Sequence, residues 1–299
     1  MKFITYNKQK ISKLSLGTVQ FGLNYGISNN TGQPSQETVN DIVNYVWKEE
    51  INCFDTAQAY GNAENVLGKA IQNKKNPLLI SKIKTELFLN NVLEHVNNSL
   101  NNLKTNELFG LLLHDTKLLY NWQALYSKSI KELKDKNKIK YFGVSIYTDD
   151  EFNKAIDNDD INFIQIPFNI FDQRAISKSW FTKAKAKNKL IFIRSIFLQG
   201  LLLMEEKSIP NNLNNVRPYL KTLSNLANKY SLSKQEMALS FVNTLAYDSL
   251  ILFGCENISQ AKENIDIFNN IKHLDKDCII ELKNAFSKID ASIYNPSKW

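Results

Sequence analysis

With 299 residues, 43% of them hydrophobic, the chain is long enough to bury a large core in one barrel domain or in two smaller domains. It contains no run of about 18 apolar residues, and Met1 to Lys13 has no apolar signal-peptide core, so we expect a cytoplasmic protein without a membrane span. The formal charge of +7 comes from lysines scattered along the whole chain, which favours a solvated surface over a nucleic-acid partner.

Short apolar segments alternate with helical patterns along most of the chain, which is typical of repeated βα units. The segments expected as strands are Leu14–Gly17, Asn52–Asp55, Leu78–Lys82, Phe109–His114, Tyr141–Ser145, Phe163–Ile166, Leu190–Arg194 and Leu250–Phe253. After the first strand, Val39, Val43 and Val46 follow helical spacing, with Ser35 as the expected N-cap. Eight such units without a linker rich in proline or glycine predict an α/β fold with one closed (β/α)8 TIM barrel, a single domain over residues 1–299.

Four segments lie outside the repeating units. Phe3 to Leu16 is predicted to form a hairpin that covers the bottom of the barrel, and Asp275 to Ile289 an additional helix. Asn24 to Ser35 and Glu205 to Arg217 are long polar stretches after the first and seventh strands, where long loops are usually functional. We expect these loops and the C-terminal tail to cover the mouth of the barrel. The residues expected to line the substrate pocket are Asn24, Tyr25, Trp180 and Trp299.

Polar residues that carry chemistry lie at the carboxyl ends of three consecutive predicted strands. They are Asp55, Lys82 and His114, and Tyr60 follows Asp55 by five residues in the loop FDTAQAYG. Barrel enzymes build their sites on this face. Each residue alone has a structural explanation, as a turn cap, an ion pair, a core histidine or a packed ring, but the four together on adjacent strand ends indicate a site.

The set suits the reduction of a carbonyl group. A phenol has an ordinary pKa near 10 and is a sluggish acid unless a nearby cation stabilises its phenolate. Lys82 supplies that cation, Asp55 holds Lys82 charged, and His114 orients the substrate oxygen. We therefore expect Tyr60 to donate the proton.

The same residues carry a resemblance to the aldo-keto reductases, including bacterial branches of that family. The chain is similar through FDTAQAYGNAENVLGKAI, ISKIK, LLLHD, GVSIY, PFNIFDQR and FGCENISQAKENI, in this order. The resemblance implies a catalytic tetrad of Asp55, Tyr60, Lys82 and His114. Lys84 competes with Lys82 for its role, since both lie on one face of an extended strand, and we favour Lys82 because it is at the strand end.

The resemblance also implies cofactor contacts. Ser145 and Gln165 would hold the nicotinamide carboxamide, although Ile146 replaces the usual asparagine. The pyrophosphate would lie along the segment RSIFLQG after the seventh strand, and the adenosine phosphate at the start of the last barrel helix. The residues implied for these two parts are Arg194, Ser195, Leu198, Gly200, Gly254, Gln260 and Asn264. Asn257 with Gln260 also fits a helix-capping pair.

The resemblance favours NADP(H), with NAD(H) possible. Gly254, Cys255 and Gln260 stand where strongly NADP-selective members place a Lys-Ser pair and an arginine, Glu256 adds a negative charge, and Lys262 is the remaining cation. We therefore expect only modest selectivity for the phosphorylated cofactor.

Four further expectations concern function and assembly. A cofactor-binding sensor on the same fold is a second interpretation, and a metal-dependent hydrolase that uses His114 with Asp115 and Asp55 is a third, disfavoured because the chain has only 3 histidines. A sugar or nucleotide-sugar carbonyl is a candidate substrate. A monomer is slightly favoured.

Overall fold

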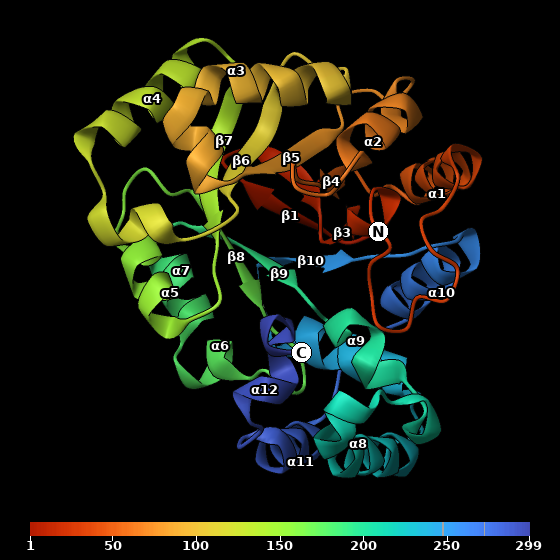
Figure 1. Ribbon diagram of the computed structural model, residues 1–299. Helices are drawn as coiled ribbons and strands as arrows, with labels where there is room; N and C mark the ends of the chain where they lie inside the picture. The colour runs from red at the N-terminus through yellow and green to blue at the C-terminus, as the bar shows by residue number, and fades with distance from the viewer. Residues whose placement is uncertain (247, 272) are drawn as a thin grey trace.

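The computed structural model describes residues 1–246, 248–271 and 273–299, and it contains a closed barrel of parallel strands in the order β10-β3-β4-β5-β6-β7-β8-β9 (Figure 1). The strands are β3 (Leu14–Gly17), β4 (Cys53–Asp55), β5 (Leu78–Ile83), β6 (Leu108–Leu113), β7 (Ile139–Ser145), β8 (Phe163–Pro167), β9 (Leu190–Arg194) and β10 (Ser249–Phe253). The predicted (β/α)8 barrel is confirmed, and the ends of each strand lie within one or two residues of the predicted ones.

Helices surround the barrel (Figure 1). They are α1 (Gln36–Lys48), α2 (Ala63–Ile71), α3 (Thr85–Leu103), α4 (Ala124–Asp135), α5 (Asp149–Ile156), α6 (Arg174–Ser177), α7 (Trp180–Ala186), α8 (Arg217–Lys229), α9 (Lys234–Leu245), α10 (Ile258–Asn269), α11 (Lys276–Phe286) and α12 (Ala291–Tyr294). Short 3-10 turns are η1 (Val19–Phe21), η2 (Lys117–Asn121), η3 (Leu198–Leu203), η4 (Glu206–Ser208), η5 (Asn211–Val216) and η6 (Pro296–Lys298). Ser35 caps α1 as predicted, by accepting a hydrogen bond from Thr38 N. The additional helix near the C-terminus is α11.

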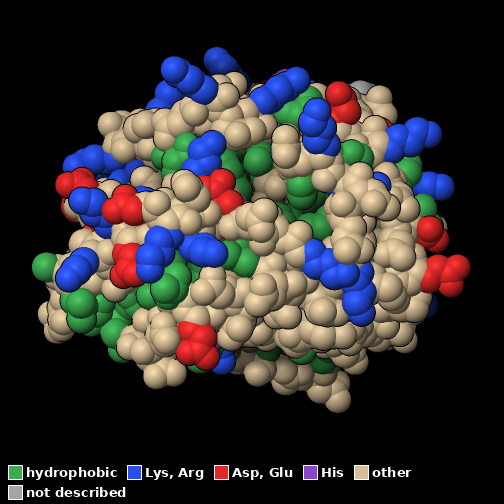
Figure 2. All heavy atoms as spheres, turned by 90° about the horizontal axis from the view of Figure 1, so that it is seen from above, with side chains coloured by type: hydrophobic (Ala, Val, Ile, Leu, Met, Phe, Trp, Pro, Cys, Tyr) green, Lys and Arg blue, Asp and Glu red, His purple; other side chains and the backbone are tan. Residues whose placement is uncertain are grey.

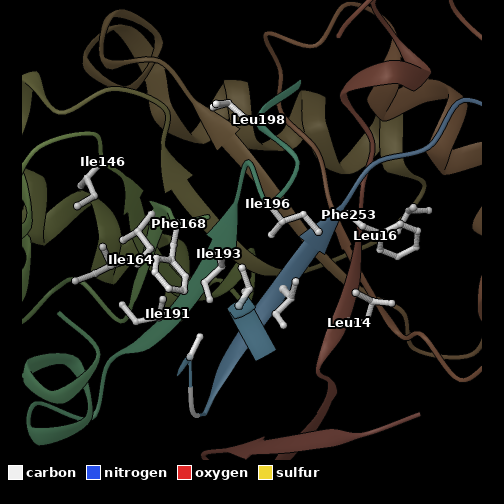
Figure 3. Close-up of a cluster of buried hydrophobic side chains, with 14 of the residues drawn as sticks. Leu14, Leu16, Ile146, Ile164, Phe168, Ile191, Ile193, Ile196, Leu198 and Phe253 are labelled. Carbon is white, nitrogen blue, oxygen red and sulfur yellow. The ribbon is translucent and has the colours of Figure 1, made fainter. Parts of the chain in front are cut away.

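Side chains alternate along the strands between two buried clusters. Ile164, Ile191, Ile193 and Phe253 belong to the larger cluster, which fills the space between the barrel and its helices (Figure 3). Phe163, Leu190, Phe192 and Leu252 belong to the cluster inside the barrel. Because successive side chains of a strand point to opposite faces, every second residue faces the barrel axis.

This alternation determines what stands at the carboxyl ends of the strands. Asp55 follows the inward-facing Cys53 by two positions, Lys82 follows Ile80, and Arg194 follows Phe192. Gln165 and His114 follow inward-facing Phe163 and Leu112 in the same way. The inside of the barrel is therefore apolar at the bottom and polar at the mouth.

The N-terminal hairpin closes the bottom of the barrel, as predicted. Strands β1 (Phe3–Tyr6) and β2 (Gln9–Ser12) pair antiparallel. The Tyr6 ring packs edge-on against Tyr141 and Phe163, with ring centroids 5.3 and 5.6 Å apart, and its hydroxyl donates to Asn188 O. The aromatic plug leaves the opposite end as the mouth.

The surface agrees with the scattered charge of the sequence. Lys and Arg side chains are dispersed over the face seen in Figure 2, interspersed with Asp and Glu. None of the helices in the described parts of the chain is long and apolar enough to cross a membrane.

Candidate active site

A cavity of about 460 Å³ opens at the carboxyl ends of the strands. Of the residues expected to be catalytic or to bind the cofactor, all but two line it: Asp55, Tyr60, His114, Ser145, Gln165, Arg194, Ser195, Gly200, Gly254, Gln260 and Asn264. Lys82 and Leu198 do not line it. Lys82 is buried beneath the cavity, and the Leu198 side chain belongs to the buried hydrophobic cluster of Figure 3.

Asp55 and Lys82 form a buried ion pair below Tyr60. The Lys82 ammonium lies 2.5 Å from Asp55 Oδ2 and also donates to Thr56 O, and the two residues are 4% and 1% exposed. Burial alone would lower the pKa of Lys82, but the Asp55 carboxylate and Tyr60 outweigh it and raise that pKa, so the ammonium stays charged. Lys84 is exposed at the N-terminal boundary of α3, so the structure brings Lys82 and not Lys84 to Asp55.

Tyr60 lies directly over this pair, with its ring centroid 4.9 Å from the Lys82 ammonium. A Cβ on Gly22 would lie 1.8 Å from Tyr60 O, so only glycine lets the loop after β3 pack this closely against the tyrosine backbone. Burial raises the pKa of Tyr60 above its ordinary value, while the Lys82 ammonium and the Arg194 guanidinium oppose that rise. The cation effect expected from the sequence is present, but burial outweighs it.

His114 completes the group. Its ring meets the Tyr60 ring edge-on, with centroids 5.6 Å apart and an interplanar angle of 87°. Burial, together with the charges of Lys82, Arg194 and Lys84, lowers the pKa of His114 from 6.5 to about 4. The imidazole is therefore neutral near pH 7, and its buried Nδ1 has no hydrogen-bond partner among the described residues.

The two carboxylates that a metal site would need, those of Asp115 and Asp55, already have other partners. Asp115 accepts hydrogen bonds from the backbone N and the hydroxyl of Thr85, and Asp55 is paired with Lys82. Within the described ranges, no three His, Cys, Asp or Glu side chains form a group that could hold a metal ion.

The residues expected at the nicotinamide end surround this group. Gln165 Nε2 donates to Asp55 Oδ1 at 2.9 Å, so it also orients the carboxylate of the ion pair. Ser145 lines the cavity, whereas the Ile146 side chain is buried in the hydrophobic cluster. The Ile146 backbone contacts two site residues: its carbonyl accepts from Arg194 and its N–H donates to Gln165 O.

The segment after β9 turns back on itself. Ser195, Leu198, Gln199 and Gly200 all have positive φ. The Leu198 amide donates to Ser195 O and the Gly200 amide to Phe197 O, so these two N–H groups are satisfied within the segment. The expected pyrophosphate contact along this segment would have to use other donors, such as the Ser195 hydroxyl.

The start of α10 is polar and carries no cation toward the cavity. Asn257 caps the helix by accepting from Gln260 N, and Gln260 Oε1 accepts from Glu256 N. The capping explanation for these residues is therefore correct. The Lys262 ammonium, the cation expected here, lies 5.6 Å from the Tyr45 ring centroid and does not line the cavity.

The loop after β3 crosses the cavity as a strap, defined here as residues 24–35. Tyr25, Gly26 and Ser28 line the cavity, and Ile27 N donates to Gln199 O. Burial raises the pKa of Tyr25 to about 12, so its hydroxyl stays protonated. Farther along, Thr31 Oγ1 lies 3.4 Å from Glu256 Oε2. The expectation that this loop lies at the mouth is confirmed.

Several other expectations about the mouth were wrong. Residues 205–217 form η4, η5 and the start of α8 and do not line the cavity. Of the expected pocket residues only Tyr25 lines it. Trp180 is fully buried in α7, where it stacks on Phe152, and the Trp299 indole donates to Ser292 O within the tail. Helix α12 packs beside η5, and its Tyr294 ring lies against Arg174, so the tail does not line the cavity.

The structure also adds lining residues that the sequence did not indicate. They include Gln20, Gln235 and Glu263. Gln20 is the most informative, because its buried Oε1 has no hydrogen-bond partner in the described chain. Gln20 and Gln235 stand in a 3-10 turn and a helix with no local sequence signal, and only the closure of the barrel brings them together.

Comparison with known proteins agrees with this geometry. A sequence model of the "Aldo/keto reductase family" matches residues 13–285. The chain is 24% identical over 242 residues to the "Uncharacterized oxidoreductase YqkF" of Bacillus subtilis, spanning 73% of this chain and 78% of that protein. The holo form of aldo-keto reductase AKR11C1 from Bacillus halodurans superposes with a TM-score of 0.79 at 20% identity over 100% of both chains. An aldo/keto reductase from Klebsiella pneumoniae in complex with NADP and acetate gives 0.71 at 17% identity over 94% of each chain.

Proposed function

The chain belongs to the aldo/keto reductase family, and we propose that it reduces an aldehyde or ketone to an alcohol with NADPH, with Tyr60 as the proton donor. The observation that carries this proposal is the buried Asp55–Lys82 ion pair directly beneath Tyr60, at the mouth of the barrel. The NADP complex of the similar structure from Klebsiella pneumoniae supports the phosphorylated cofactor.

When bound, the reduced nicotinamide supplies a hydride for the carbonyl carbon. The residues of the chain manage the proton that the carbonyl oxygen needs. Because burial raises its pKa, Tyr60 is protonated at neutral pH and available as an acid. The Lys82 ammonium stabilises the phenolate as the proton leaves, and Asp55, fixed by Gln165, keeps Lys82 in place.

His114 acts in this proposal as a neutral hydrogen-bonding group. With a pKa of about 4 it adds no positive charge that would compete with Lys82 for the phenolate. It orients the carbonyl oxygen between the Tyr60 hydroxyl and the hydride donor.

The cavity suits the cofactor in its volume and in most of its polar groups. Its volume lies within the range usual for ligand sites, and the unpartnered Gln20 Oε1 offers a polar group for a ligand. Ser145 and Gln165 would hold the carboxamide, Ser195 the pyrophosphate, and the start of α10 the adenosine end. Since Glu256 and no cation faces the adenosine end, we expect NADPH to be favoured over NADH by a modest factor only.

Other parts of the proposal concern substrate and assembly. We propose that residues 1–299 work as one domain, as a monomer, on a small carbonyl compound such as a sugar or nucleotide sugar. A cofactor-binding sensor remains the second candidate, because it would use the same cavity.

The test is NADPH oxidation with a panel of aldehydes, ketoses and keto-sugars by the unmodified protein and by Tyr60→Phe. We expect Tyr60→Phe to bind NADPH normally, as followed by protein fluorescence, and to lose at least about a hundredfold in kcat, the scale of a lost general acid. Near-normal kcat in this variant would refute the role of Tyr60. Tight NADPH binding without turnover of any compound would favour the sensor.

A further inference from the structure

We propose that Arg194 binds an anionic group, a carboxylate or a phosphate, carried by the carbonyl substrate. The inference rests on the proposed reductase function and narrows its substrate class. Four features of the guanidinium carry it: its place in the barrel, the way it is held, its missing counter-charge and its nearness to Tyr60 and His114.

Arg194 is the last residue of β9 and ends the inward-facing series Leu190, Phe192, Arg194. Its side chain therefore projects from the inner face of the barrel into the mouth. It lines the same cavity as Tyr60 and His114. An anion bound by Arg194 would share the cavity with the group being reduced.

The guanidinium is held by neutral groups. One terminal nitrogen donates to Ser195 Oγ at 3.3 Å and the other to Ile146 O at 3.0 Å. Its carbon lies 4.1 Å from the centroid of the Tyr147 ring, a cation–π contact. A guanidinium has five N–H donors in a planar fork, so these two bonds leave donors for a ligand.

Tyr147 is itself fixed by a second arginine. Arg174 donates to Tyr147 O at 2.5 Å, and its own charge is neutralised by Asp172, whose carboxylate lies 2.7 Å away. Arg174 also lies over the Tyr294 ring of α12. The backbone that carries the Tyr147 ring is thus held in place before any ligand arrives.

Arg194 lacks the counter-charge that the neighbouring cations have. Lys82 is paired with Asp55 and Arg174 with Asp172, but Arg194 forms no ion pair with any residue in the described part of the chain. A half-buried guanidinium on neutral partners leaves one positive charge in the cavity. A carboxylate or phosphate matches it, because both accept two parallel N–H bonds from one guanidinium.

The charge acts on the reacting groups. The Arg194 guanidinium contributes to the lowered pKa of His114 and opposes the raised pKa of Tyr60, so it lies within electrostatic reach of both. Tyr25, whose hydroxyl stays protonated, lines the same space. The substrate that fits is therefore a small carbonyl compound that also carries an anionic group, because Arg194, Tyr60 and His114 line one cavity.

The experiment compares matched pairs of substrates. The carboxylate arm uses 4-oxobutanoate against its methyl ester, and the phosphate arm D-glyceraldehyde 3-phosphate against D-glyceraldehyde, each with NADPH. We expect kcat/KM to be about ten- to a hundredfold higher for the anionic member of one arm, the scale of one charge-assisted contact. The arm that shows the difference identifies the anion.

Variants connect the preference to Arg194. Arg194→Met should abolish the difference by raising KM for the anionic member. Because the Arg194 charge reaches Tyr60 and His114, its loss should change kcat for both members of a pair alike, so the ratio of the two kcat/KM values isolates the contact with the anion. Arg194→Lys should retain part of it, because the charge remains without the fork. Arg217→Met is the matched control: it removes the same charge at a residue that does not line the cavity and should leave the preference intact.

Two results would overturn the inference. One is equal kcat/KM for both members of both pairs in the unmodified protein. The other is a loss of NADPH affinity in Arg194→Met without a change in preference, which would assign the guanidinium to the cofactor. Reduction of the neutral members in either case would leave the reductase function standing. Titration of the NADPH complex with butanoate and butanamide, which cannot be reduced, tests Arg194 without turnover.

Discussion

Lys82 shows how a single buried residue connects the folding of this barrel to its proposed chemistry. An ammonium that is 1% exposed is tolerated because Asp55 accepts its hydrogen bond and Thr56 O a second one. Removing one partner of a buried ion pair leaves an uncompensated charge and costs about 3 to 5 kcal/mol. Lys84, two positions later, is exposed and has no such role in the core.

The two lysines therefore make a matched pair for a pH experiment. Lys82 opposes the raised pKa of Tyr60, so Lys82→Met should raise that pKa further. Reduction requires the protonated phenol and fails as pH rises through its pKa. The basic limb of kcat/KM should thus move to higher pH in Lys82→Met, with a lower plateau because the acid is weaker.

Lys84→Met should keep both the pH profile and the free energy of unfolding close to those of the unmodified protein. Urea unfolding of both variants separates the loss of stability in Lys82→Met from its effect on the profile. A shifted profile in Lys84→Met and a normal one in Lys82→Met would mean that the wrong lysine has been assigned to Tyr60.

At the scale of elements, α10 and the strap border the part of the cavity that we propose for the adenosine end of the cofactor. Helix α10 presents Gln260 and Asn264 to the cavity, and Glu256 precedes it. The strap lies against Gln199 and Gly200 after β9 and reaches Glu256 through Thr31. The strap and the start of α10, which are far apart in the sequence, therefore line the same cavity.

Cofactor selectivity should follow from the charge at α10. Gln260→Arg adds a guanidinium at the start of α10, which presents no cation to the cavity. We expect it to increase selectivity for NADPH over NADH by about ten- to a hundredfold, the scale of one charge-assisted contact. Titration of both cofactors by quenching of protein fluorescence measures this. Lys262→Met is the control and should change little, because Lys262 lies over Tyr45. A thousandfold preference in the unmodified protein would mean that another residue reads the phosphate.

The packing of the strap gives a prediction with two glycines. Gly200 has φ of +91°, and a Cβ there would lie 1.9 Å from Ser28 Oγ, whereas Gly32 has φ of +78° with nothing within 4 Å. Gly200→Ala should therefore displace the strap, cost about 1 to 3 kcal/mol and speed NADPH release. Gly32→Ala carries only the backbone penalty, about 1 kcal/mol. Equal release rates in the two variants, measured by stopped-flow fluorescence, would show that the strap does not retain the cofactor.

The sequence predicted those elements whose signal is local. The strands could be predicted because each is a short apolar run between helical patterns, and Asp55, Lys82 and His114 followed because they stand at the carboxyl ends of these runs. The prediction that residues 205–217 cover the mouth was wrong, because polarity alone does not distinguish a loop at the mouth of the barrel from a loop beside it. Trp180 was placed wrongly because its burial against Phe152 depends on how α5 and α7 pack, which no local pattern encodes.

At the scale of the whole molecule, the hairpin and the cavity lie at opposite ends of one barrel. Tyr6 fills the bottom, where its ring meets Tyr141 and Phe163, while Tyr60 stands at the mouth. An inner column of apolar residues separates the two ends. Substitution at the bottom of the barrel should therefore change stability without changing the site at the mouth.

Tyr6→Ala tests this separation. Loss of a large buried aromatic side chain should lower the free energy of unfolding by about 3 to 5 kcal/mol, with NADPH affinity unchanged below the new melting temperature. Tyr6→Phe is the control, since it removes only the hydrogen bond to Asn188 O and should cost about 0.5 to 1.5 kcal/mol. Thermal unfolding and fluorescence titration give the two quantities. A fall in cofactor affinity in Tyr6→Ala at full folding would mean that the two ends communicate.

At five strand ends the inward-facing residues change from apolar to polar, namely at Asp55, Lys82, His114, Gln165 and Arg194. This change bears on how such a protein diversifies. Leu190 and Phe192 pack in the cluster inside the barrel, while Arg194, on the same face of the same strand, lines the cavity and is not part of that cluster. Except for the buried Asp55–Lys82 pair, substitutions at these upper positions can therefore change the substrate without removing the core that stabilises the barrel. Directed evolution of this barrel would begin at the same upper positions and leave the apolar cluster inside the barrel unchanged, because that cluster stabilises the fold.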